Sequence, residues 1–333
     1  MNRIAHWLCL AACLAAVTLR AAVDPLPSWN EGQTRQSILK FVAEVTTPGT
    51  SLFVAPAERI AVFDNDGTLW TEQPAYTQFY FVMDRVKAAA ARHPEWNTQE
   101  PFKSALTGDI KGLLTSGVQG LVKLPGAACE GMTIEEYDRA AHDWLETTRH
   151  PRFARPYLEC VYQPMLELLA FLRASGFKTY IVSGGSLEFM RPWTEKVYGV
   201  PPEQLIGSTV RNKMELRNGQ PVIVRQAEVD LVNDKVEKVL SIQRVIGRRP
   251  ILAFGNSDGD LPMLQWTAAG GGRRFCGYVR HTDGEREYAY DRTAAVGRLD
   301  KGLDEAGSRG WTVVDMKRDW KRVFPFEAAP AGR

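Results

Sequence analysis

The chain has 333 residues, enough for one large domain or for a core domain with a smaller insert. Its hydrophobic content of 44% and its charged content of 24% are ordinary for a soluble globular protein. The formal net charge is only +2, so the composition indicates no electrostatic surface for a nucleic acid.

The first 22 residues predict a secretory signal peptide. Arg3 precedes a short apolar run at 7–19, and the small residues Ala21 and Ala22 offer a cleavage site. Because the run is too short to span a bilayer, we expect no integral membrane association after its removal. The mature protein is therefore expected in the periplasm or outside the cell.

Two other interpretations of this segment are a buried N-terminal helix and a lipoprotein box ending at Cys13, which only a few apolar residues precede. Cleavage would remove Arg3 and Arg20 and bring the formal charge from +2 to 0. The three cysteines that remain are Cys129, Cys160 and Cys276. They allow one disulfide or a set of buried free thiols, and their spacing does not suggest a zinc site.

Next along the chain, apolar residues at 38, 41, 42 and 45 predict a helix, which begins after a capping-box-like pair at 30 and 33 and stops at 48–49. An apolar strand follows at 60–63. Residues 71–159 show helical patterns without a strand, so we expect a helical cap inserted beside the sheet.

Helix and strand then alternate, which is typical of a parallel sheet. The predicted elements are a helix at 165–172, a strand at 178–182, a hairpin at 209–224, a helix at 235–246, and strands at 251–254, 275–279 and 311–315. The fold class is therefore α/β, a doubly wound and mainly parallel sheet. Residues 23–70 and 160–333 form its core.

The strongest chemical signal is a pair of acids, Asp64 and Asp66, directly after the apolar strand 60–63. Open α/β sheets bind ligands at the carboxyl ends of their strands. Two carboxylates there favour a divalent cation, and one of them can attack phosphorus while the other moves a proton. The alternative to a catalytic pair is a plain Asx turn after the strand. A calcium-binding loop is excluded, because alignment of Gly67 with the obligatory glycine of that loop puts Val62 at its first ligand position and Gln73 at its last.

Two further strands end in polar, glycine-containing turns, at 183–186 and 255–260. Together with the acidic strand end, they resemble the motifs of the haloacid dehalogenase (HAD) superfamily. The resemblance covers about residues 59–263, and its first motif, residues 63–69, is highly specific. It implies that Asp64 is the nucleophile of a phosphoaspartyl intermediate. Asp66 would be the acid and base, and its backbone carbonyl a metal ligand.

The resemblance also implies the groups that bind phosphate. Ser183 matches the hydroxyl of the second motif, and the bare backbone of Gly184 offers N–H groups to phosphoryl oxygens. The third motif is a lysine near the start of a helix, for which Lys235 and Lys238 are both candidates; we choose Lys238.

The fourth motif departs from the common pattern. Asn256 stands where the family usually carries a metal-binding aspartate, and Asp260 follows four residues later. We expect Asp64, Asp66, Asn256 and Asp260 to hold Mg²⁺, with weaker affinity because an amide brings no formal charge. Asp258 is a further acid, and its charge compensates for the neutral amide of Asn256 if its side chain faces the site.

Within the superfamily the chain looks most like the phosphoserine-phosphatase-like branch. In that enzyme a glutamate after the first motif reads the substrate amine, whereas here Glu72 is one position early and Gln73 takes the matching place. Serine phosphate is therefore a doubtful substrate. Late in the chain, 273–274 and 281–283 flank a strand and are interpreted as structural rather than catalytic.

The sequence thus predicts an exported, magnesium-dependent phosphomonoesterase that acts on a small-molecule phosphate monoester. The alternative is a non-catalytic HAD-fold protein that binds a phosphate ligand and has a weakened metal site, as Asn256 suggests. Carbon–halogen hydrolysis would need neither a metal nor Asp66. The identity of the ester is not encoded in the spacing of these motifs.

Overall fold

The protein is built around one eight-stranded sheet, in a computed structural model that describes residues 24–327 apart from the side chains of residues 114 and 117–122. The strands are β1 (Ile60–Phe63), β2 (Lys178–Ser186), β3 (Leu205–Arg217), β4 (Gln220–Leu231), β5 (Leu252–Gly255), β6 (Phe275–Thr282), β7 (Ala289–Tyr290) and β8 (Thr312–Asp315). The predicted signal peptide and Cys13 lie outside the described residues.

The sheet has the order β4-β3-β2-β1-β5-β6-β7, with β8 also paired to β6. β1 lies between β2 and β5 and runs parallel to both. The antiparallel pairs are β3 with β4 and β6 with β7. The predicted fold class, a mainly parallel α/β sheet, is confirmed.

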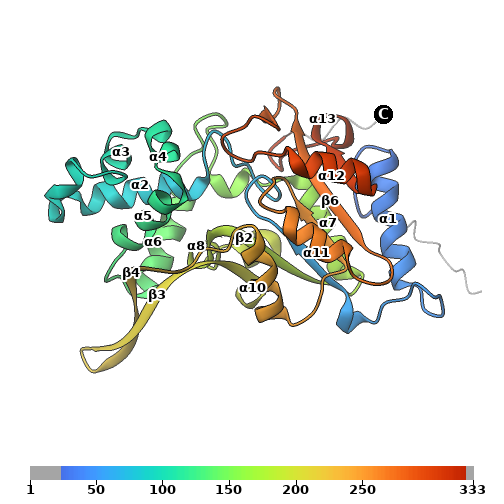
Figure 1. Cartoon of the computed structure of the whole chain (residues 1–333), viewed down its shortest axis with the longest axis horizontal. Coiled ribbons are helices and arrows are strands. Elements are labelled where there is room, and N and C mark those ends of the chain that lie inside the picture. The colour runs from blue at the N-terminus through green and yellow to red at the C-terminus, as the bar shows by residue number, and fades with distance from the viewer. Residues whose placement is uncertain (1–23, 328–333) are drawn as a thin grey trace, which may run out of the picture.

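Helices cover both faces of this sheet (Figure 1). The core helices are α1 (Gln33–Thr46), α7 (Gln163–Ala174), α8 (Leu187–Met190), α9 (Thr194–Tyr198), α10 (Val236–Ile246), α11 (Leu261–Ala268), α12 (Lys301–Arg309) and α13 (Met316–Asp319). The cap helices are α2 (Thr77–Ala89), α3 (Phe102–Thr107), α4 (Ile110–Thr115), α5 (Gly117–Ala128) and α6 (Ile134–Thr147). Short 3₁₀ turns lie at Pro56–Glu58, Ala90–Arg92, Pro94–Asn97, Tyr157–Glu159 and Pro202–Gln204.

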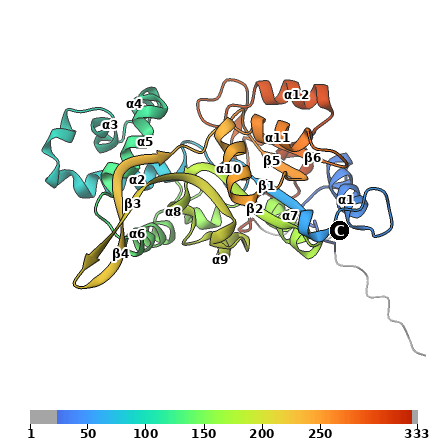
Figure 2. The same cartoon turned by 60° about the horizontal axis from the view of Figure 1, so that its bottom comes forward.

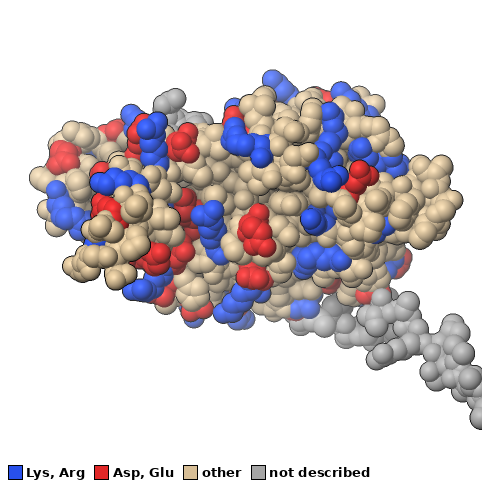
Figure 3. Space-filling model, turned by 90° about the horizontal axis from the view of Figure 1, so that it is seen from below, with Lys and Arg blue, Asp and Glu red and all other residues tan. Residues whose placement is uncertain are grey.

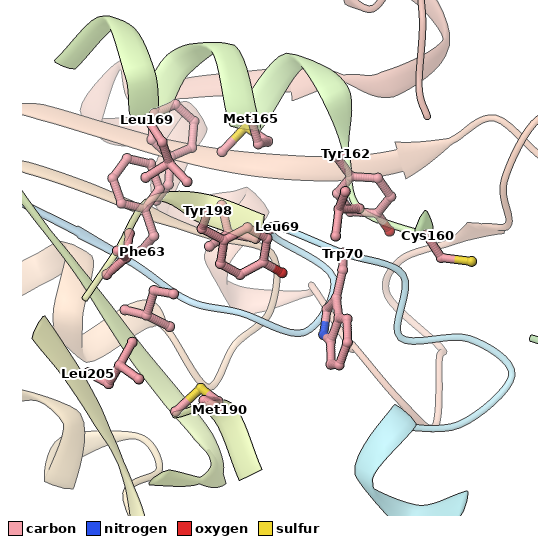
Figure 4. Close-up of a cluster of buried hydrophobic side chains, with 14 of the residues drawn as sticks. Phe63, Leu69, Trp70, Cys160, Tyr162, Met165, Leu169, Met190, Tyr198 and Leu205 are labelled. Carbon is pink, nitrogen blue, oxygen red and sulfur yellow. The ribbon is translucent and has the colours of Figure 1, made fainter. Parts of the chain in front are cut away.

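The strand β1 is buried on both faces, which explains its continuous apolar run. Phe63 faces the apolar cluster that includes α1 and α7, whereas Val62 faces the cluster of α10, α11 and α12. In Figure 4, Met165 and Leu169 of α7 project toward the Phe63 side of this core. This packing holds the end of β1, and therefore the acids that follow it, in a fixed place.

The hairpin β3–β4 is longer than its predicted range of 209–224. Its turn is Asn218-Gly219, both with positive φ, as the sequence signal predicts. The start of β3 pairs with β2, but the outer arm leaves the core and runs beside the cap helices (Figures 1 and 2). The Arg225 N–H donates to the carbonyl of Met132 at 2.9 Å. The lid thus consists of the helical insert together with a hairpin that the sequence assigned to the core.

A buried arginine joins the hairpin, the cap and the core. Arg225 of β4 is fully buried, and its guanidinium lies 4.0 Å from the ring centroid of Tyr137 on α6. It also lies 3.4 Å from the carboxylate of Glu188, on the core helix α8. Because a charge is costly to bury without its partner, we infer that this pair fastens the lid to the core.

Three further observations concern the rest of the molecule. Cys129, Cys160 and Cys276 are buried free thiols, so none of them forms a disulfide in this structure. Within residues 24–327, no helix combines the length and the apolar character needed to cross a membrane. On the face drawn in Figure 3, basic and acidic side chains are interspersed.

Candidate active site

The two acids predicted from the sequence lie at the end of β1, in the middle of the sheet. The backbone folds back here, because the carbonyl of Asn65 accepts hydrogen bonds from the N–H groups of Thr68 and Leu69. Gly67 has a φ of +72°, and a Cβ at this position would lie 2.1 Å from Nδ2 of Asn256. A side chain other than hydrogen would therefore push the first and fourth motifs apart.

Lys238 lies directly against the first acid. Its Nζ is 2.6 Å from Oδ1 of Asp64 and 2.6 Å from Oδ1 of Asp260, and the lysine is 3% exposed. Burial alone would lower the pKa of Lys238, but the two carboxylates outweigh it and hold this pKa above its usual range. Lys235, the other candidate, is exposed one residue before α10.

Both oxygens of the Asp260 carboxylate already accept hydrogen bonds. Its Oδ1 is bound by Lys238, and its Oδ2 accepts from the N–H groups of Asn256 and Ser257 at 3.0 and 3.1 Å. These contacts orient the lysine and shape the loop after β5, and the metal role of Asp260 stays a prediction. Asp258 also faces elsewhere, since its carboxylate accepts from the N–H groups of Asp300 and Gly302.

Asn256 occupies the expected position beside Asp64, in the loop after β5. Its Oδ1 accepts from the hydroxyl of Thr68 at 3.1 Å, and its Nδ2 donates to Oε1 of Glu72 at 2.6 Å. The hydroxyl of Tyr290 donates to the same oxygen at 2.8 Å. Sequence reasoning missed this role of Glu72; its only signal was an acid three residues after the first motif.

Negative charge at this site exceeds the positive charge of its one lysine. Burial and the neighbouring Asp260 raise the pKa of Asp64 to about 8, although Lys238 opposes this shift. Burial raises the pKa of Asp66 to about 6 against the lowering effect of a hydrogen bond from the Trp70 indole. Burial, with Asp66 and Asp64 nearby, also raises the pKa of Glu72 well above its usual range. A further cation would relieve this excess.

The oxygens at the site suit a hard divalent cation. Magnesium prefers oxygen donors and is commonly held by one or two carboxylates. The carboxylate of Asp64, the backbone carbonyl of Asp66 and the amide oxygen of Asn256 are donors of this kind. Among the described residues, no three His, Cys, Asp or Glu side chains are arranged to hold a metal. The backbone carbonyl of Asp66 and the amide oxygen of Asn256 would complete the donor set.

The second motif lies next to the acids: burial raises the pKa of Asp66, and a hydrogen bond with the Ser183 side chain opposes this shift. Ser183 is fully buried, and its Oγ accepts from the N–H of Gly185 at 2.9 Å. Gly184, Gly185 and Ser186 line the pocket, whereas Ser183 does not. A Cβ on Gly185 would lie 3.6 Å from Oδ2 of Asp66, so this loop and the acids can meet one small ligand.

These groups open into a pocket of about 260 Å³ between the core and the lid. Asp64, Asp66 and Lys238 line its inner end, and cap helices and the hairpin line the rest. Gln78 of α2 connects the two parts, because its side-chain oxygen accepts from the N–H of Ser186 at 2.8 Å.

The late strand β6 contributes support from behind the site. His281 is buried, and its Nε2 lies 2.8 Å from the carbonyl of Gly67 while its Nδ1 lies 3.1 Å from Glu287. His281 therefore positions the first-motif loop without reaching the pocket. Arg273 pairs with Glu44 on α1.

The geometry defines an α/β protein with an aspartate-based site at a strand end. Comparison with known protein families identifies the family. The model of the haloacid dehalogenase-like hydrolase family matches residues 61–265, so the chain belongs to this family. No curated protein matches the sequence.

Solved structures give a similar result for the fold. A functionally unknown protein from Anaerococcus prevotii DSM 20548 is 12% identical, with 86% of this chain and 93% of that chain covered and a TM-score of 0.53, which shows a shared fold. A protein of unknown function from Bordetella pertussis Tohama I is 14% identical over 78% and 99% of the two chains, with a TM-score of 0.49. A phosphoserine phosphohydrolase-like protein from Francisella tularensis is 14% identical over 76% and 99%, with a TM-score of 0.40.

Proposed function

We propose that this protein is an exported, magnesium-dependent phosphomonoesterase of the phosphoserine-phosphatase-like branch. The observation that carries the proposal is the triad of Asp64, Lys238 and Asp260 beside Asp66, at the inner end of the pocket. Lys238 holds Asp64 in place and stabilises its ionised form, which is the form that can attack phosphorus.

In the proposed reaction, an oxygen of Asp64 bonds to phosphorus while the ester P–O bond on the opposite side breaks. Asp66 gives its proton to the leaving oxygen, and burial raises the pKa of this carboxyl above its usual range, which favours the protonated form that the step needs. Water then attacks the phosphoaspartyl group, and Asp66 takes a proton from this water. Inorganic phosphate leaves and Asp64 is restored.

Asp64, the Asp66 carbonyl and Asn256 would hold the Mg²⁺ that the family resemblance implies. When bound, the ion supplies the positive charge that lets a carboxylate approach an anionic ester. Backbone N–H groups of the Gly184–Gly185 loop and Lys238 would bind the phosphoryl oxygens, with Ser183 holding that loop through its bond to Gly185.

The test measures release of p-nitrophenol from its phosphate ester, with magnesium and with a chelator. We expect turnover that needs magnesium and falls by about 10⁴-fold or more in Asp64→Asn, the scale seen when a nucleophile is removed. Asp258→Asn is the matched control, because this nearby acid faces away from the pocket and its amide keeps an acceptor oxygen. Equal losses in both variants would contradict the assignment.

The alternative, a non-catalytic binder, is motivated by Asn256, whose amide is already engaged by Thr68 and Glu72. It predicts undetectable turnover together with intact binding of inorganic phosphate.

Export is tested separately, by sequencing the N-terminus of the protein from the periplasmic fraction. A mature chain that begins near residue 22 supports export, and an intact Met1 contradicts it.

A further inference from the structure

The pocket has two chemically different ends. Carboxylates, Lys238 and the C-terminal end of β2 line the inner end. The outer end, which we call the apolar chamber, is lined mainly by aliphatic and aromatic side chains from the lid. Its principal residues are Phe79 and Val82 of α2, Leu113 of α4, Leu124 of α5, and Val229 and Leu231 of β4. Three separate stretches of the chain, at 79–82, 113–124 and 229–231, thus contribute apolar residues to one space.

Charge at the chamber is unsuited to a second anionic or zwitterionic group. Lys238 is the only cationic side chain among the described residues that line the pocket, and Asp64 and Asp260 already engage it. The other charged residues that line the pocket besides Asp64 and Asp66 are also acids, Glu72 and Asp234. A carboxylate or a second phosphate on the leaving group would therefore find no partner here and would lose its hydration.

The size of the pocket sets the size of the leaving group. An apolar cavity of about 150 Å³ is enough to hold a benzene ring. The pocket volume of about 260 Å³ therefore accommodates a phosphoryl group together with a group of about six carbons. Glu72, the residue closest to an amine reader in the sequence, is instead held by Asn256 and Tyr290.

We propose that the preferred substrates are phosphate monoesters of uncharged, apolar alcohols, with an alkyl or aryl leaving group that occupies the apolar chamber. This inference rests on the proposed phosphatase function and adds its substrate class. The preference among substrates comes from burial of the leaving group against the side chains of the lid. The charged inner end contacts the phosphoryl group, which is the same in all phosphate monoesters, so it does not distinguish them.

The first experiment compares kcat/KM for propyl, butyl, pentyl and hexyl phosphate with that for phosphoserine. The alkyl alcohols have nearly equal acidity, so differences report binding in the chamber and not leaving-group reactivity. We expect kcat/KM to rise about fourfold per methylene, the factor that corresponds to about 0.8 kcal/mol per buried CH₂. Phosphoserine should be the poorest substrate. A flat series, or a preference for phosphoserine, would overturn the inference.

A variant pair tests whether the chamber is the cause. Leu231→Lys places a cation in the chamber wall, at a half-buried position. We expect it to lower the hexyl-to-propyl ratio by about tenfold or more and to raise kcat/KM for phosphoserine. The control is Ile223→Lys on the same strand, 49% exposed and outside the pocket, which should leave the ratio unchanged. An unchanged ratio in Leu231→Lys would contradict the assignment.

A binding measurement separates this inference from the proposed function. Methyl-, propyl- and hexylphosphonate cannot be hydrolysed, and their dissociation constants are measured by calorimetry on the unmodified protein with magnesium. Affinity that rises with chain length supports the chamber even if no ester is turned over, in which case the phosphatase proposal alone fails. Turnover of all esters, together with equal phosphonate affinities, would leave the phosphatase standing and reject the substrate class.

Discussion

The inner end of the pocket and the apolar chamber are built in different ways. The inner end collects side chains from the ends of β1, β2 and β5 and from α10, all fixed by the buried sheet. The chamber is built by the lid, whose helices and hairpin contact the core through fewer elements. On the proposed function, the core would set the reaction, whereas the lid would set which leaving groups are accepted.

Loss of the single cation of the inner end should have the largest effect. Lys238→Met is expected to lower kcat by about 10²- to 10³-fold, because a positive charge next to the transferring group is lost. It also leaves Asp64 and Asp260 without their partner, so the free energy of unfolding should fall by about 3–5 kcal/mol. Activity and chemical denaturation are measured together.

Lys235→Met is the control for this prediction, since Lys235 is exposed three residues earlier. It should leave kcat nearly unchanged. The free energy of unfolding should stay within about 0.5 kcal/mol of that of the unchanged protein, as is usual for surface substitutions. A larger loss of activity in Lys235→Met than in Lys238→Met would reverse the assignment of the third motif.

The link between lid and core is tested at Arg225. Arg225→Ala leaves Glu188 buried without a counter-charge and should cost about 3–5 kcal/mol in unfolding free energy. Arg211→Ala is the control on the same hairpin, because its pair with Glu228 is exposed on both sides and is worth at most about 1 kcal/mol. Equal losses, measured by urea denaturation, would mean that the buried pair does not fasten the lid.

The metal site of the inner end is tested at Asn256. In Asn256→Asp, a second carboxylate would face Glu72 at the place of the present 2.6 Å hydrogen bond. The metal-free protein should then be less stable, by about 1–3 kcal/mol for a lost buried pair. If magnesium binds about tenfold more tightly, its stabilising effect should grow by about 1.4 kcal/mol.

The measurement for Asn256→Asp is the melting temperature with magnesium and with a chelator. Combining Asn256→Asp with Glu72→Gln restores an acid–amide pair and should recover the stability of the metal-free protein. An equal magnesium effect in the unchanged protein and in Asn256→Asp would argue against a metal ligand at this position.

The smallest effect is expected where the two ends of the pocket meet. Gln78→Ala removes the acceptor for the Ser186 N–H, a contact between α2 and the C-terminal end of β2. One hydrogen bond of this kind contributes about 0.5–1.5 kcal/mol, so KM should rise by about two- to tenfold with little change in kcat. Steady-state kinetics with an alkyl phosphate measures this. A fall in kcat without a change in KM would instead make Gln78 part of the chemistry.

Local sequence patterns predicted much of the fold and the acids at the centre of the site. The apolar run 60–63 followed by two acids predicted a buried strand with Asp64 and Asp66 at its end, because parallel strands place their carboxyl ends at one edge. The Asn218-Gly219 turn predicted the hairpin. These signals work at short range, since they depend on neighbouring residues.

Other features depend on residues that are far apart in the chain. Nothing near Asp260 indicates that Lys238 and two backbone N–H groups occupy both of its oxygens. The bond between Glu72 and Asn256 joins residues 184 positions apart. The hairpin follows β2 in the sequence, so only packing against α5 and α6 reveals that it belongs with the lid.

The sequence by itself determined the α/β class, the order of the motifs and the acids at the first strand end, because buried strands and tight turns require particular residues locally. The tertiary structure brought Lys238 against Asp64, joined the Ser183 hydroxyl to the N–H of Gly185 and assembled the apolar chamber. Those outcomes depend on which distant side chains share a buried space, and no local pattern specifies that.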